Sequence, residues 1–333
     1  MKKCCVTFIL LASLWLSACQ TGMEKQPADA TDTAKETAAA VTDTSAVTLP
    51  LTDTDADTDA DTQEDASLPG QSAEETEPPA PDAFDVTEMR VTRDGLSIYG
   101  RLYTPVEAEG KYPAVILSHS ANMTSDSMSS YCQRLAAMGY VAYAFDFCGG
   151  SKNSRSDGDE ADMTVFTEVE DLEAVLEAVR GLDCVDSQSV YLFGTSQGGL
   201  VSALTAAAHP DAVRGLMLFY PAFNIAELAE KFGSFMTGNA GSLYISTLQG
   251  YDVYEHITPY TGDVLIVHGT KDFIVPSSYA EKAADLYEHC ELHLIEGASH
   301  GFNKENYAMF GDYDQESWAY VVTYLEAHAG DGT

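Results

Sequence analysis

Three polar residues, Ser196, Asp272 and His300, stand in settings that favour nucleophilic catalysis. Ser196 is the centre of a Gly-x-Ser-x-Gly sequence, which follows the apolar run 190–193 and precedes the helix-forming segment 200–208. A strand, a sharp turn and a helix in this order expose a serine hydroxyl at the apex of the turn. The same short pattern also occurs in ordinary glycine-rich loops, so its interpretation depends on the other two residues.

Asp272 and His300 supply the partners that a serine nucleophile needs. Asp272 follows the apolar run 263–268, and His300 follows the run 291–295. Both runs are typical of buried parallel strands, whose carboxyl ends meet at one edge of a sheet. In such a site Ser196 attacks an acyl carbonyl, His300 accepts its proton, and Asp272 fixes the tautomer of His300.

Three other polar residues at strand ends have simpler interpretations. Asp146 could compete as the acid, but it precedes the serine, whereas the order Ser, Asp, His places the acid between the other two. His119 and His268 lie in loops after strands, where we expect them to hydrogen-bond the backbone; direct contact with a substrate is the alternative.

The elements that must position these residues alternate along the chain. Apolar runs predict buried strands over residues 112–118, 140–146, 190–193, 213–220, 263–268 and 291–295. Helices are predicted over residues 127–138, 165–179, 200–208, 277–287 and 316–327. A hairpin of residues 87–92 and 96–103 precedes them. The pattern predicts an α/β fold with a mostly parallel sheet, helices on both faces, and antiparallel strands at one edge.

Residues 222–261 interrupt this alternation with an aromatic-rich segment that contains no strong strand. A connection of this length in a compact domain is usually functional, so we expect a small helical lid over the site. A packed structural insertion is the alternative.

Taken together, the motifs resemble those of a known superfamily. Residues 84–330 resemble an α/β-hydrolase of the serine esterase type, on the strength of the segments 196–199, 268–276 and 297–302. They are similar to the cinnamoyl/feruloyl esterase and dipeptidyl-peptidase-like branches. The resemblance implies the α/β-hydrolase fold and a Ser-His-Asp triad of Ser196, His300 and Asp272, with no cofactor and no metal.

The resemblance also implies an oxyanion hole. Its donors would be the backbone N–H groups of Gln197 and Ala121. Ala121 lies in the loop that follows the strand 112–118, where relatives usually carry His-Gly before the donating residue. In this chain Ser120 replaces that glycine, which raises a question about the conformation of the loop.

The charge of the chain excludes one class of partner. Its 17 Lys and Arg residues against 52 Asp and Glu residues give a formal net charge of −35. Nucleic-acid binding needs a basic face, so no nucleic-acid partner is expected.

The N-terminal part of the chain indicates export and anchoring. Residues 1–18 combine a basic start with a short apolar run and precede Cys19, as in a bacterial lipoprotein signal; an ordinary signal peptide is the alternative. Lipidation of Cys19 would anchor the protein to the outer face of a membrane. Residues 19–83 contain few apolar residues and many acidic ones, and predict a disordered stalk. Its acidic repeat, residues 53–61, lacks the glycine of a calcium loop.

The sequence therefore predicts a membrane-tethered, extracytoplasmic serine esterase. Its partner would be a small-molecule or polysaccharide-linked ester, with an aromatic or medium acyl group such as a hydroxycinnamoyl group. A serine peptidase and a non-catalytic binding lipoprotein are the alternatives. Four cysteines remain after the signal and predict buried thiols or at most one disulfide: Cys132, Cys148, Cys184 and Cys290. The sequence leaves the oligomeric state open.

Overall fold

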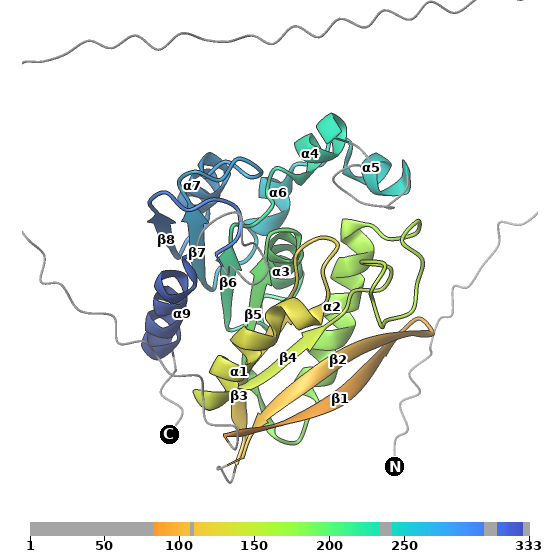
Figure 1. Ribbon diagram of the computed structural model, residues 1–333, viewed down its shortest axis with the longest axis vertical. Coiled ribbons are helices and arrows are strands. Elements are labelled where there is room, and N and C mark those ends of the chain that lie inside the picture. Colours follow the sequence, from red (N-terminus) through yellow and green to blue (C-terminus); the bar gives the residue numbers. More distant parts are fainter. Residues whose placement is uncertain (1–82, 107–109, 233–241, 303–311, 329–333) are drawn as a thin grey trace, which may run out of the picture. The chain divides into compact units, whose positions relative to one another are not determined.

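The computed structural model describes residues 83–106, 110–232, 242–302 and 312–328. An eight-stranded sheet runs through this part of the chain in the order β1-β2-β4-β3-β5-β6-β7-β8 (Figure 1). In the run β4-β3-β5-β6-β7-β8, every pair of adjacent strands is parallel. The pairs β1–β2 and β2–β4 are antiparallel. The strands are β1 (Phe84–Arg93), β2 (Leu96–Pro105), β3 (Tyr112–Ser118), β4 (Val141–Phe145), β5 (Val185–Thr195), β6 (Gly215–Phe219), β7 (Asp263–Gly269) and β8 (Cys290–Ile295).

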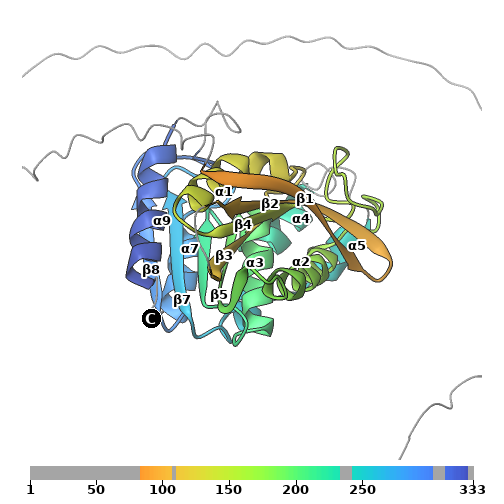
Figure 2. The same cartoon turned by 90° about the horizontal axis from the view of Figure 1, so that it is seen from below.

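Helices cover both faces of the sheet, as Figures 1 and 2 show. The helix α1 packs with α9 on one face, while α2, α3, α6 and α7 pack on the other. The helical elements are η1 (Ser125–Met128), α1 (Ser129–Ala137), α2 (Val165–Arg180), α3 (Gln197–Ala208), α4 (Ile225–Phe232), α5 (Ser242–Leu248), α6 (Val253–Ile257), α7 (Ser278–Leu286) and α9 (Asp314–His328).

The central strands are apolar along their whole length because each one contributes to two cores. In β5, Leu192 packs on the side of α2 and α3, and Phe193 packs on the side of α1 and α9. Leu216 and Met217 of β6 divide in the same way. A strand buried on both faces cannot alternate apolar with polar residues, which explains the continuous apolar runs in the sequence.

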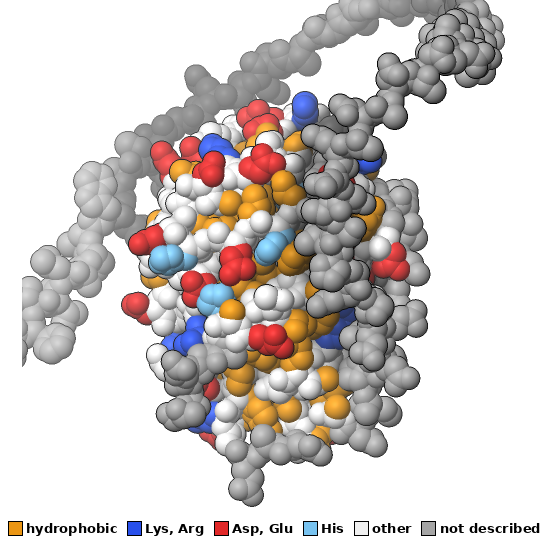
Figure 3. All heavy atoms as spheres, turned by 90° about the vertical axis from the view of Figure 1, so that its left-hand side faces the viewer, with side chains coloured by type: hydrophobic (Ala, Val, Ile, Leu, Met, Phe, Trp, Pro, Cys, Tyr) orange, Lys and Arg blue, Asp and Glu red, His pale blue; other side chains and the backbone are white. Residues whose placement is uncertain are grey.

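The two edges of the sheet are formed by β1 of the hairpin and by β8. The hairpin of β1 and β2 turns at Asp94 and Gly95, both at positive φ, as a two-residue hairpin turn requires. The strand β8 carries charged and polar side chains, including Glu291 and His293, which are half exposed. In Figure 3, this side of the molecule shows acidic and histidine side chains scattered among apolar ones. Such interruptions discourage pairing with another strand.

The predicted architecture is confirmed. Each strand and helix expected from the sequence is present, and the hairpin lies at one edge of the sheet. The largest difference is β5, which begins at Val185 instead of residue 190 because its polar first half, residues 186–189, still adopts an extended conformation. Within the described ranges, the structure has no helix that is both long and apolar enough to cross a membrane. The predicted signal, Cys19 and the stalk lie outside the described residues.

Candidate active site

Ser196 occupies a strained turn between β5 and α3. Its φ of 51° lies in the left-handed region, which non-glycine residues rarely adopt without compensating contacts. The flanking glycines make this turn possible: a Cβ on Gly194 would lie 2.3 Å from the carbonyl oxygen of Gly198, and one on Gly198 would lie 2.3 Å from that of Ser118. The Ser196 N–H donates to Phe219 O at 3.0 Å, which fixes the turn against β6.

The expectation of a hydroxyl exposed above the sheet needs one correction. Ser196 is only 9% exposed, because the segment after β6 covers the turn. The residue lies instead in a cavity of about 170 Å³. The cavity is lined by Ser120, Ala121, Asn122, Ser196, Gln197, Ala222, Ile225, Leu228, Ala229, Tyr244, Ile274 and His300. Access to the serine is therefore through a partly open and mainly apolar space.

The structure brings Ser196, His300 and Asp272 together, although 104 residues separate the serine from the histidine. His300 Nδ1 donates to Asp272 Oδ2 at 2.7 Å, which leaves Nε2 as an acceptor. The Ser196 hydroxyl donates to that Nε2 at 3.0 Å. This is the hydrogen-bonding order of a nucleophile, a base and an orienting acid.

Asp272 is held in its ionised form by the loop around it. Burial by itself would raise its pKa, but hydrogen bonds from His268 and His300 outweigh burial and hold the pKa well below its usual range. The backbone N–H groups of Ile274 and Val275 also donate to its Oδ1, at 2.9 and 2.8 Å. Both oxygens of Asp272 are therefore engaged, and the carboxylate has a fixed orientation.

His268 contacts Asp272 and is not among the residues that line the cavity. Its Nε2–H donates to Val275 O at 2.8 Å, as expected from the sequence, and also lies 3.3 Å from Asp272 Oδ2.

The loop after β3 contributes Ala121 to the lining of the cavity that also contains Ser196 and Gln197. The loop does not need a glycine at position 120, because its left-handed residue is Asn122, with φ of 60°. The Ser120 hydroxyl instead hydrogen-bonds the Thr195 hydroxyl at 2.9 Å. Ser120 thus connects the loop to the end of β5, and the conformation of the loop accommodates serine in place of glycine at position 120.

His119 braces the same loop. Phe147 N–H donates to its Nε2 at 3.3 Å, so its Nδ1 carries the proton and donates to Ser120 O at 2.8 Å. Burial lowers the pKa of this imidazole and keeps it neutral. The expected backbone hydrogen bonds are present, and His119 does not line the cavity.

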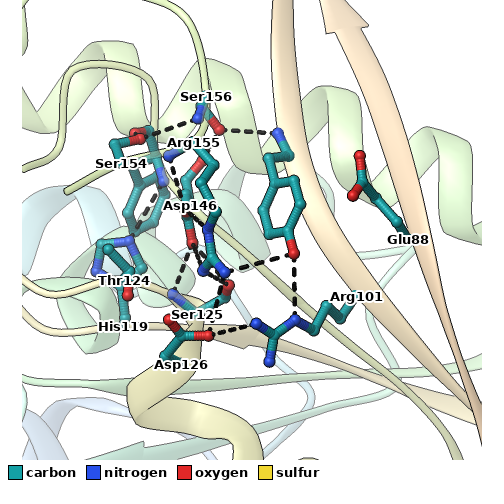
Figure 4. A network of polar contacts seen from close by, with 12 residues as sticks. Glu88, Arg101, His119, Thr124, Ser125, Asp126, Asp146, Ser154, Arg155 and Ser156 are labelled. Carbon is teal, nitrogen blue, oxygen red and sulfur yellow. Dashed lines mark hydrogen bonds and ion pairs between the residues drawn. The ribbon is translucent and has the colours of Figure 1, made fainter.

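Asp146 anchors the far end of the loop, where its carboxylate accepts hydrogen bonds from Ser125 and Arg155 (Figure 4). Its Oδ1 accepts from the Ser125 N–H and hydroxyl at 2.8 and 2.6 Å, and its Oδ2 accepts from Arg155 Nε at 2.9 Å. Burial alone would raise the pKa of Asp146, but these hydrogen bonds hold it below its usual value. Arg155 continues the network to Asp126, which also pairs with Arg101.

This network predicts that Arg155→Met will lower the free energy of unfolding by about 3 kcal/mol, because it leaves the fully buried Asp146 carboxylate without its cation. Urea denaturation with an unchanged m-value measures the loss. Arg101→Met is the matched control and should cost less than about 1 kcal/mol, because its partner Asp126 is exposed. Equal losses in the two variants would contradict the role given to Asp146.

One buried group near the site was not predicted from the sequence. Glu168 of α2 is 1% exposed and accepts a hydrogen bond from Gln197 Nε2 at 2.7 Å. Burial, aided by the like charge of Asp171, raises the pKa of Glu168 to about 8. A signal was available: residue 168 lies three positions after Val165 and four before Leu172, on the apolar face of the helix.

The raised pKa of Glu168 predicts a pH dependence of stability. The folded protein keeps this proton up to about pH 8, whereas the unfolded chain releases it near 4.5. Stability from this group is thus greatest below pH 4.5 and falls as the pH rises towards 8, with a limiting slope of about 1.4 kcal/mol per pH unit. Glu168→Gln removes the titration, so its free energy of unfolding relative to wild type should rise between pH 5 and pH 8. Parallel pH profiles, as expected for the exposed control Glu177→Gln, would contradict this.

The described part of the chain contains no group of three His, Cys, Asp or Glu residues that could hold a metal ion. The four cysteines after the signal are present as free thiols, with Cys132 and Cys148 buried and Cys184 and Cys290 partly buried.

The chain is similar to a known family and to a solved structure. The Hydrolase_4 family model, described as serine aminopeptidase, S33, matches residues 111–249. The structure titled as ferulic acid bound to Est1E from Butyrivibrio proteoclasticus is 27% identical, with a TM-score of 0.62, and the match covers 73% of this chain and 100% of the other. The chain has the α/β-hydrolase fold.

Two curated proteins resemble parts of this chain. Caffeoylshikimate esterase of Arabidopsis thaliana is 33% identical over 135 residues, which are 38% of this chain and 40% of the relative. An uncharacterised protein of Mycobacterium tuberculosis is 25% identical over 191 residues, 57% of this chain and 63% of the relative. The chain thus spans less than two thirds of the length of either relative.

Proposed function

We propose that this α/β-hydrolase is a serine esterase that cleaves carboxylic esters through an acyl-enzyme. The observation that carries the proposal is the hydrogen-bonded series from Ser196 through His300 to Asp272, of which Ser196 and His300 line a mainly apolar cavity. The family match and the esterases among the similar proteins support the same reaction class.

In the first half of the reaction, the Ser196 oxygen attacks the ester carbonyl carbon while its proton passes to His300 Nε2. The oxyanion that forms accepts hydrogen bonds from the backbone N–H groups of Gln197 and Ala121, which line the same cavity. The bond to the alcohol then breaks, and His300 gives its proton to the departing oxygen. Ser196 is left as an acyl ester.

In the second half, water repeats these steps. His300 Nε2 takes a proton from the water as its oxygen attacks the acyl carbonyl, and the proton returns to the Ser196 oxygen when the acid leaves. The ionised Asp272 stabilises the imidazolium in both halves, because its pKa is held far below neutrality. Four proton transfers, two in each half, and one water balance the hydrolysis.

We extend the proposal to the acyl group: an aromatic or medium acyl chain, such as a hydroxycinnamoyl group. The cavity of about 170 Å³ is lined by Ile225, Leu228 and Ile274 among other apolar residues, and an apolar space of about 150 Å³ is enough to hold a benzene ring. The similarity to Est1E, whose structure has ferulic acid bound, supports the same acyl group.

A panel of p-nitrophenyl esters and methyl hydroxycinnamates tests both levels of the proposal. Turnover of several esters supports the reaction class, and a preference for acyl groups with one ring supports the narrower statement. No turnover of any ester would overturn the first. Turnover of short acyl groups alone would overturn only the second.

A peptidase is the second candidate, because the matching family model is described as a serine aminopeptidase. The same triad cleaves amides and esters, so the fold does not decide between them. Aminoacyl p-nitroanilides compared with the corresponding esters separate the two: a larger kcat/KM for the anilides would favour the peptidase.

We also propose that the enzyme is a lipoprotein anchored through Cys19 on the outer face of a membrane. The basic start, the short apolar run and the position of Cys19 support this. Expression of the full chain in a bacterium should place it in the membrane fraction. Cys19→Ala should lose the lipid mass and the membrane association, and retention of both would contradict the anchor.

A further inference from the structure

The residue after the nucleophile belongs to a buried chain of hydrogen bonds that the proposed mechanism does not use. Gln197 Nε2 donates to Glu168 Oε2 at 2.7 Å, and Gln197 Oε1 accepts from the Tyr244 hydroxyl at 2.7 Å. Exposed fractions are 1% for Glu168, 3% for Gln197 and 0% for Tyr244. The chain thus joins the core helix α2, the turn of the nucleophile and the helix α5 of the insertion.

The amide of Gln197 has one orientation in this chain. The Tyr244 hydroxyl is a donor here, so the amide oxygen faces Tyr244 and the amide nitrogen faces Glu168. Glu168 can accept from that nitrogen whether it is ionised or protonated. At neutral pH it is mainly the neutral acid, since burial raises its pKa to about 8. The oxygen that accepts from Gln197 is then equivalent to an amide oxygen.

The helix α5 depends on Tyr244 for its position. Tyr244 and Leu248 are the buried side chains of this seven-residue helix among those described, with exposed fractions of 0% and 1%. Leu248 packs in the apolar core without directional contacts. The hydrogen bond of Tyr244 is therefore the directional tie between this helix and the nucleophile turn.

Tyr244 also lines the cavity, together with Ser196 and the apolar side chains of α4. A ring fixed by its hydroxyl sets the shape of that wall. If the hydrogen bond between Tyr244 and Gln197 is lost, Gln197 keeps a buried unpaired oxygen and the Tyr244 ring is free to move. Any acyl group that packs on the ring then binds less tightly.

We propose that Tyr244 determines which acyl groups the cavity accepts, and that Glu168 and Gln197 are positioning residues that hold it. The inference rests on the proposed esterase function, because it concerns selectivity for the acyl part of an ester. Acyl groups that reach the wall, such as those with one ring, need the tie, whereas an acetyl group does not extend that far.

The test measures kcat and KM for p-nitrophenyl acetate and p-nitrophenyl 3-phenylpropanoate. The ratio of kcat/KM between the ring ester and the acetate should fall about fivefold to tenfold in Tyr244→Phe and Glu168→Leu, mainly through KM. Glu168→Gln keeps an acceptor for Gln197 Nε2 and should retain the wild-type ratio. Two matched controls should also retain it: Glu177→Gln on the exposed side of α2, and Tyr287→Phe, which removes a buried hydroxyl without a partner.

Equal losses for both esters in Tyr244→Phe would overturn the inference, because a merely structural role lowers activity without changing selectivity. A reduced ratio in Glu168→Gln would also overturn it, since the ionisable group and not the hydrogen bond would then matter. If Glu168→Leu does not fold, Tyr244→Phe with its control Tyr287→Phe decides alone. Failure of the proposed function is recognised separately, as no turnover of either ester by the wild-type enzyme.

Discussion

Ser196→Ala is expected to lower kcat for ester hydrolysis by about 10⁴- to 10⁶-fold. The variant has no oxygen to attack the carbonyl carbon, and His300 then has no hydroxyl at the 3.0 Å now observed. Residual activity above the rate in water would come from oxyanion donors and binding alone. Because alanine and serine tolerate a φ of 51° equally poorly, the thermal midpoint should change little.

Ser202→Ala is the matched control for this prediction. Ser202 lies on the same helix, α3, and its buried hydroxyl has no hydrogen-bond partner. Removing that hydroxyl should leave kcat within about twofold of wild type, since no contact to the site is lost. Activity that survives in Ser196→Ala, measured with protein shown to be free of wild-type enzyme, would contradict the assignment of the nucleophile.

Asp272→Asn is expected to lower kcat by about 10⁴-fold at neutral pH. The backbone N–H groups of Ile274 and Val275 should hold the amide oxygen of the variant where Oδ1 now accepts from them. The amide nitrogen then faces His300, whose Nδ1 must become an acceptor. Its Nε2 carries the proton and cannot take one from Ser196.

The readout for Asp272→Asn is kcat against pH, together with circular dichroism to show an intact fold. Asp285→Asn, an exposed substitution on α7, should behave as wild type. A loss below tenfold in Asp272→Asn would mean that another group orients His300.

The fold was predictable because the apolar pattern follows directly from the burial of the strands. A strand such as β5, which faces a core on each side, must be apolar at consecutive positions, and helices between such strands imply a parallel sheet. The start of β5 was harder to locate, because residues 186–189 are polar and extended, and an apolar count cannot detect them.

The site was predictable to the extent that it depends on chain order. Ser196, Asp272 and His300 each follow a parallel strand, and the carboxyl ends of such strands lie at one edge of a sheet. Their contacts in the structure are the geometry on which the proposed roles rest, and the roles themselves stay a prediction.

What the sequence could not provide are contacts between distant side chains. Asp146 follows a strand like Asp272, and only the structure shows that its carboxylate is committed to Ser125 and Arg155. The hydrogen-bonded chain from Glu168 to Tyr244 joins residues 76 positions apart through Gln197. No local pattern encodes a pairing of that kind, because either partner alone could be an ordinary buried or exposed residue.

Mass spectrometry of the protein after reaction with a small fluorophosphonate is the most direct test of Ser196 as the nucleophile. We expect one adduct, on the peptide that contains Ser196, and no adduct in Ser196→Ala. We also expect prior incubation with a slowly hydrolysed ester to block the labelling, because the acyl group then occupies the Ser196 oxygen. An adduct on another residue, or a wild-type protein that stays unlabelled while folded, would contradict Ser196 as the nucleophile.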